Sequence, residues 1–103
     1  KPLAYFYVEA FFMAMNYYFY ILCSELKEIY YYGSSDDPDR RLGYHNNEQS
    51  GFTQRHRPWN LLFTHGFKTR QEAEAAERLV KAWKSKKMTR LLIRGKIDLN
   101  NYL

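Results

Sequence analysis

One carboxylate in the second half of the chain, Glu77, lies on or beside the apolar face of a predicted helix. It lies four residues after one member of a helix-spaced apolar stripe and three before another. The stripe consists of Ala73, Ala76, Val80 and Trp83. A carboxylate turned toward a core or a cleft is costly unless it is paired or bound to a cation. Two interpretations stay open: Glu77 binds a cation, or it pairs with Lys81, four residues on.

A second pair of residues suggests phosphate chemistry. Arg41 and His45 are four residues apart, so they share one face of a helix, with Leu42 close by. An arginine and a histidine beside an apolar residue could bind a phosphate, because the guanidinium fork matches phosphate oxygens. The alternative is an ordinary amphipathic helix with a solvated polar face.

Tyrosines are concentrated in two short segments that read as strands. Alternation puts Tyr18 and Tyr20 on one face of the first; in the second, Tyr30 and Tyr32 face one way and Tyr31 the other. Most of these rings should be core or rim residues. A phenol has a pKa near 10, so it acts as a base at neutral pH only where cations or a preorganised site assist it.

The elements that must position these groups follow from local patterns. Pro38 suits the first turn of a helix, and Thr69 with Glu72 forms a capping box. We predict strands over 17–23, 29–34 and 59–65, helices from about 37 to 46, 69–85 and 86–94, and a loop over 47–58. The order predicts an α+β fold: a small, mostly antiparallel three-stranded sheet flanked by helices. The segment 95–103 reads as a weakly specified C-terminal tail.

Composition limits the possible functions. The 103 residues suit one domain, which we place at 15–94, and the formal net charge of +5 favours a polyanionic partner such as nucleic acid. A single cysteine excludes an internal disulfide, and the three histidines show no zinc-ligand spacing with it. The apolar run that starts at Leu3 is too short to span a bilayer and contains Glu9, so no membrane association is expected. Residues 1–14 read either as a leader or non-native extension or as an extra structural element. The sequence leaves the oligomeric state open.

Taken together, the motifs resemble the GIY-YIG endonucleases, in particular small single-domain members. The resemblance covers about residues 17–94, and its ordered spacing is more specific than any one tripeptide. Tyr20 and Tyr31 stand eleven residues apart, and Arg41 lies ten past Tyr31. The matching segments are Tyr18-Phe19-Tyr20, Tyr31-Tyr32-Gly33, D-x-x-R-R-L-x-x-H-N at 37–46, R-P-W-x-L at 57–61 and T-x-x-E-A-x-x-x-E at 69–77. Two features depart from the family pattern: the first tripeptide lacks Gly and Ile, and no Asn stands near Thr89.

The resemblance implies a metal-dependent endonuclease that hydrolyses DNA phosphodiester bonds, in DNA repair, recombination or processing, in the cytoplasm. Glu77 would hold one divalent cation, Mg²⁺ or alternatively Mn²⁺. Arg41 would bind the phosphate, Tyr20 would act as general base or orient the water, and Tyr31 would position the water or the phosphate. His45 would accept a proton from a tyrosine or contact the phosphate.

Basic residues outside this set are candidates for binding DNA backbone phosphates without reading sequence. They are Arg55, Arg57, Lys81, Lys84, Lys86 and Lys87. Each has the alternative of being a solvated surface charge. The competing function, from another class, is a non-catalytic nucleic-acid-binding module that retains the GIY-YIG fold.

Overall fold

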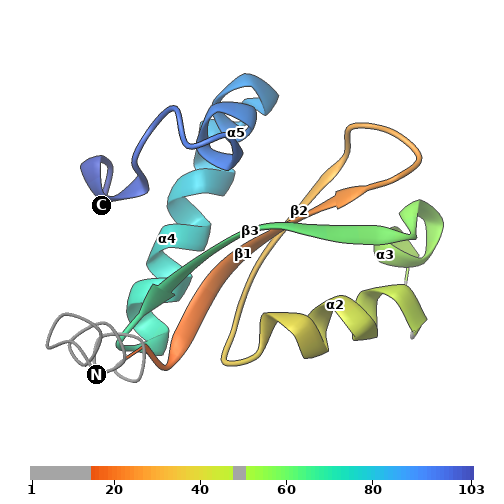
Figure 1. The fold of residues 1–103 in the computed structure, drawn as a ribbon, viewed down its shortest axis with the longest axis horizontal. Coiled ribbons are helices and arrows are strands. Elements are labelled where there is room, and N and C mark those ends of the chain that lie inside the picture. The colour runs from red at the N-terminus through yellow and green to blue at the C-terminus, as the bar shows by residue number, and fades with distance from the viewer. Residues whose placement is uncertain (1–14, 48–50) are drawn as a thin grey trace, which may run out of the picture.

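The computed structural model describes residues 15–47 and 51–103, so the expectation for residues 1–14 lies outside the described residues. Three strands form one antiparallel sheet of order β2-β1-β3, flanked by helices as the sequence predicts (Figure 1). The elements are β1 Tyr17–Ser24, β2 Tyr30–Ser35, α2 Pro38–Asn47, α3 Gly51–His56, β3 Trp59–Phe67, α4 Arg70–Trp83, α5 Lys86–Ile93 and the 3-10 helix η1 Leu99–Asn101. In this part of the chain, no helix is both long and apolar enough to cross a bilayer.

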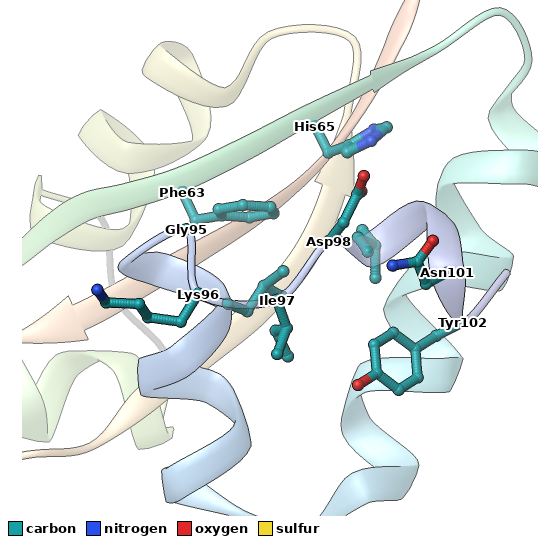
Figure 2. A pocket seen from close by; sticks show the side chains of 10 residues that line it. Phe63, His65, Gly95, Lys96, Ile97, Asp98, Asn101 and Tyr102 are labelled. Carbon is teal, nitrogen blue, oxygen red and sulfur yellow. The ribbon is translucent and has the colours of Figure 1, made fainter.

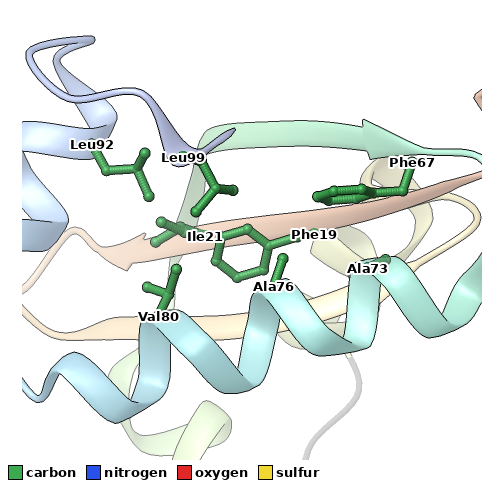
Figure 3. Packing of buried hydrophobic residues seen from close by; sticks show 8 residues of the cluster. All are labelled: Phe19, Ile21, Phe67, Ala73, Ala76, Val80, Leu92 and Leu99. Carbon is green, nitrogen blue, oxygen red and sulfur yellow. The ribbon is translucent and has the colours of Figure 1, made fainter. Parts of the chain in front are cut away.

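Strand β1 is the centre of the sheet, and its alternating side chains contribute to two separate cores. Phe19 and Ile21 pack on one face against α4, in a cluster that includes Ala73, Ala76 and Val80 (Figure 3). Tyr20 and Leu22 point to the opposite face, where α2 and Trp59 cover them. The two faces of the sheet therefore carry different groups, with α4 and α5 on one side and α2 on the other (Figure 1).

Helix α4 forms where the capping box predicts it. Thr69 is the N-cap, and its hydroxyl accepts a hydrogen bond from the Glu72 backbone N–H. The helix ends at Trp83, and its C-cap Lys84 adopts the left-handed conformation with φ of 49°. Ser85 then caps α5 by accepting a hydrogen bond from the Met88 N–H. This tight junction sets the lysines at 81, 84 and 86 close together.

The segment 95–103 is more ordered than its sequence indicates. Asp98 caps η1 through a hydrogen bond from the Asn100 N–H, and Leu99 is buried in the α4-side core. Between this segment and β3 lies an open hollow of about 590 Å³, and Phe63, His65 and Asp98 are among the residues that line it (Figure 2). No periodic pattern in this segment predicted its structure, because a single buried leucine has no periodicity. No residue of the Tyr20 face lines this hollow.

The expected loop over 47–58 is wrong for residues 51–56, which form the short helix α3. A helix of six residues is too short for its apolar spacing to be recognised in a sequence. Tertiary contacts stabilise it: Thr53 is buried, and its carbonyl accepts a hydrogen bond from the Trp59 indole N–H at 3.0 Å.

Strand β3 carries a bulge that the sequence pattern did not indicate. Ile21 pairs with Phe63 while the next residue, Leu22, pairs with Leu61, so Leu62 has no partner in the ladder and is exposed. Because of this extra residue, Leu61 joins the α2-side core and Phe63 the α4-side core, although residues two apart normally share a face.

Candidate active site

Tyr20 is the centre of an aromatic and basic cluster on the α2 side of the sheet. Its ring is almost fully buried, and its hydroxyl lies 3.4 Å from Nε2 of His45. The Tyr31 ring stacks against Tyr20 at 6.4 Å between centroids and approaches the His45 ring at 4.3 Å. Side chains from β1, β2 and α2 therefore meet at one place, although they are spread over 26 sequence positions.

A glycine on β2 makes room for the Tyr20 ring. Gly33 pairs with Tyr20 across the ladder, and a Cβ there would overlap the Tyr20 hydroxyl and ring. The Tyr31-Tyr32-Gly33 tripeptide thus places one ring beside Tyr20 and leaves a gap for Tyr20 two residues later.

His45 is a buried, neutral imidazole. Burial, and secondarily the positive charge of Arg41, lower its pKa to about 4. The ring is therefore uncharged at neutral pH. Nδ1 is buried and makes no hydrogen bond within the described part of the chain, while Nε2 faces the Tyr20 hydroxyl. An imidazole with one nitrogen aimed at a phenol can exchange a proton with it.

The pKa of Tyr20 is raised above its ordinary value, mainly because burial disfavours the phenolate. The neighbouring Tyr31 and the negative charge of Glu77 add to the rise, whereas the interaction with Arg41 opposes it. Tyr20 is thus a protonated phenol at neutral pH. This electrostatic environment favours the water-orienting role over a free phenolate base.

Arg41 joins the cluster to the outer surface of α2. Its guanidinium lies over the ring of Tyr44, 4.5 Å from the centroid, and interacts with the Tyr20 hydroxyl. The stacking holds the planar guanidinium in one orientation. Arg41 also lines an open hollow of about 460 Å³ on the helix surface, so solvent and ligands can reach it.

Glu77 lies on α4, the helix on the other side of the sheet from α2, and no hydrogen bond or ion pair between described residues joins it to the other four residues. Its Oε2 accepts a hydrogen bond from Lys81 Nζ at 2.6 Å, which is the i+4 pairing that the sequence left as an alternative. The Glu77 side chain is only 21% exposed. Its negative charge helps to raise the pKa of Tyr20. Among the described residues, no group of three or more His, Cys, Asp or Glu side chains could enclose a metal ion.

The predicted DNA-contacting residues divide into separate places. Lys81, Lys84 and Lys86 line one hollow of about 320 Å³ with Tyr30 and Tyr32, on the α4 side of the sheet. Lys87 is exposed on α5, and Arg55 is exposed on α3. Arg57 instead donates a hydrogen bond to the Asn46 carbonyl at 3.2 Å, so part of its guanidinium is used within the fold.

Two residues that the sequence did not assign to the site join the strands to the helices on either side of the sheet. The Asn46 side chain accepts from the Trp59 N–H at 2.6 Å and donates to the Trp59 carbonyl at 3.1 Å, which ties α2 to the start of β3. Thr89, where no family Asn stands, shares a hydrogen bond of 2.8 Å with the Tyr32 hydroxyl. The adjacency of Asn46 to His45 and of Trp59 to Arg57-Pro58 was the available signal for the first of these contacts.

Comparisons with known proteins identify the family of the chain. The chain matches the profile of the GIY-YIG catalytic domain over residues 16–90. It is similar to the UPF0213 protein BH0048 from Bacillus halodurans, solved by solution NMR, with 30% sequence identity, a TM-score of 0.47, and coverage of 76% of this chain and 83% of that chain. The comparison with curated proteins gave no match. Because the family profile spans most of the sequence, the chain belongs to the GIY-YIG catalytic domain family.

Proposed function

We propose that the protein is a metal-dependent endonuclease that hydrolyses DNA phosphodiester bonds, in DNA repair, recombination or processing. The observation that carries the proposal is the grouping of Tyr20, Tyr31, Arg41 and His45. An accessible guanidinium stands beside a buried phenol and a neutral imidazole. This set provides a phosphate ligand and a proton pathway at one place.

The roles of the residues follow from their protonation states. Arg41 binds the scissile phosphate and stabilises the charge that grows on it during attack. Tyr20, as a protonated phenol, orients the attacking water, with Tyr31 packed beside it. In the tautomer with the proton on Nδ1, Nε2 of His45 accepts the proton that Tyr20 passes on. A phosphate bound at Arg41 offsets the positive charge that helps to lower the pKa of His45, so the imidazole accepts a proton more readily in the complex.

The available ligands fit Mg²⁺ held by a single carboxylate. Glu77 is the acidic group whose charge reaches Tyr20, and Mg²⁺ commonly takes one carboxylate together with waters and substrate phosphate. That carboxylate now accepts a hydrogen bond from the Lys81 ammonium, and the cation would replace Lys81 as its partner. When bound, the cation would neutralise charge on the phosphate and on the leaving oxygen. Mn²⁺ has similar ligand preferences and is expected to substitute for it.

Exposed basic residues supply affinity for DNA. Lys84, Lys86 and Lys87 at the α4–α5 junction, and Arg55 on α3, carry charges that phosphates can approach. Such contacts are independent of base sequence and weaken steeply as the salt concentration rises. They support DNA binding in either function, catalytic or not.

A cleavage assay separates the two functions. Supercoiled plasmid, linear duplex and branched DNA are incubated with the wild-type protein and with Arg41→Ala, in Mg²⁺ or in excess chelator. We expect cleavage by the wild type in Mg²⁺ alone, and a loss of about 10²–10³-fold in rate for Arg41→Ala, the usual effect of removing one transition-state ligand. A wild-type protein that binds all three DNAs and cleaves none would identify a non-catalytic binding module instead.

A further inference from the structure

Gly43 occupies an unfavourable position in helix α2. It is the sixth of the ten residues Pro38–Asn47, and glycine is among the poorest residues in a helix interior. Its φ is not in the left-handed region, unlike that of Gly51 or Gly95. Apart from its two chain neighbours and the nearby backbone of the helix itself, no heavy atom of the described residues lies within 4 Å of the point where a Cβ would stand. Within the described part of the chain, neither the backbone conformation nor the packing therefore requires a glycine at position 43.

The space beside Gly43 is an open, positively charged hollow. It measures about 460 Å³ and is lined, besides Gly43, by Arg40, Arg41, Tyr44 and Asn47. Arg40 is paired with Asp36 at 2.9 Å, but both side chains are more than 60% exposed, so the pair is weak. The Arg40 guanidinium can therefore exchange Asp36 for another anion. Arg41 belongs both to this hollow and to the Tyr20 cluster. The hollow therefore adjoins the proposed site of phosphate attack.

We infer that this hollow receives the sugar–phosphate backbone of the DNA strand next to the scissile phosphate, and that Gly43 is there so that the strand can approach the helix closely. The inference rests on the proposed function. Two guanidinium groups flank a position with no side chain, which suits a polyanionic strand that passes over the helix. Tyr44 forms one side of the hollow and fixes the plane of the Arg41 guanidinium.

Two substitutions of Gly43 test the inference, because both raise helix propensity but they add side chains of different volume. Gly43→Ala and Gly43→Gln both raise helix propensity, so both proteins should be at least as stable as the wild type, with thermal midpoints higher by about 2–8 °C. The two side chains differ in volume and fill the hollow to different extents. Ala75→Gln, an exposed position on α4, adds a glutamine to a helix away from the hollow and is the matched control.

The readouts are affinity for a labelled DNA duplex and the rate of Mg²⁺-dependent cleavage. We expect affinity to fall about threefold for Gly43→Ala and at least about tenfold for Gly43→Gln, because overfilling a close contact is destabilising. Cleavage should fall with it, and Ala75→Gln should match the wild type. Unchanged DNA affinity in both Gly43 variants would overturn the inference, even if the wild type cleaves DNA as proposed.

The binding and cleavage arms keep the two proposals apart. If the wild type binds DNA without cleaving it, the catalytic proposal fails, and the size-dependent loss of affinity still decides the role of Gly43. If the wild type binds no DNA, both proposals fail. Poly-glutamate of matched charge is the competing probe: loss of its binding in Gly43→Gln with DNA affinity retained would assign the hollow to an acidic protein partner and refute our inference.

Discussion

Replacing Glu77 by Gln separates a metal ligand from a surface ion-pair partner. The change keeps the size and helix propensity of the side chain and removes its charge. The structure shows an i,i+4 pair with Lys81 at 2.6 Å, in which the lysine is half exposed. Pairs of this kind contribute about 0.3–0.5 kcal/mol, so the thermal midpoint should fall by no more than about 4 °C. If Glu77 also holds the cation, cleavage in Mg²⁺ should fall by about 10²–10³-fold.

The same helix offers a matched control. Glu74 pairs with Arg70 at 3.2 Å, also with i,i+4 spacing and with a side chain 38% exposed. Glu74→Gln should therefore cost a similar small amount of stability. Glu74 is not among the groups that mainly shift the pKa of Tyr20, so cleavage should remain at the wild-type rate.

The assay measures cleavage rate against Mg²⁺ concentration, thermal unfolding and DNA affinity for all three proteins. DNA affinity should change little, because the lysines and arginines are intact. A readout without metal is the titration of Tyr20: removing the Glu77 charge should lower the pKa of this phenol, since that charge now raises it. Wild-type cleavage by Glu77→Gln, or an equal loss in Glu74→Gln, would refute the assignment of Glu77 as the cation ligand.

Two further predictions concern the Tyr20 cluster. The pKa of His45 is about 4 in the folded protein and 6.5 ordinarily, so the unfolded chain binds more protons between these values; stability should be fully present above about pH 6.5 and decrease by up to about 3 kcal/mol as the pH falls toward 4. Denaturant unfolding across this range should show the decrease, and His45→Gln should largely remove it; an equal decrease in that variant would contradict the assignment. Gly33→Ala should destabilise the fold by about 1–3 kcal/mol and displace Tyr20, because the new methyl group overlaps its ring. A crystal structure of Gly33→Ala with Tyr20 unmoved, together with normal stability, would show that the overlap is relieved elsewhere.

Local physics allowed several parts of the fold to be predicted. Strand alternation separated Tyr20 from Phe19, and Tyr31 from its neighbours, onto the two faces that the structure shows. The capping box at Thr69 and the apolar stripe that follows located α4 and its buried face. These features depend on residues within a few positions of one another, and such interactions are present in the sequence itself.

The structural contacts of the candidate site depend on distant parts of the chain. The Tyr20–His45 contact joins residues 25 apart, Asn46 meets Trp59 across 13 residues, and Tyr32 meets Thr89 across 57. Helix α3 and the bulge at Leu62 likewise depend on packing on the α2 side of the sheet. Local patterns do not encode these contacts, because the partners come together only when the three-stranded sheet and its helices have folded.

The sequence alone determined the order of the three strands and of helices α2, α4 and α5, the alternation of the strand tyrosines between the two faces of the sheet, and a set of residues that resembles a nuclease family. Only the tertiary structure decided the protonation states in that set. Burial keeps the Tyr20 phenol protonated and the His45 imidazole neutral, while Glu77 is paired with Lys81. The physical reason is desolvation: the free energy of a charge depends on the solvent and on the groups that folding removes from it or places around it.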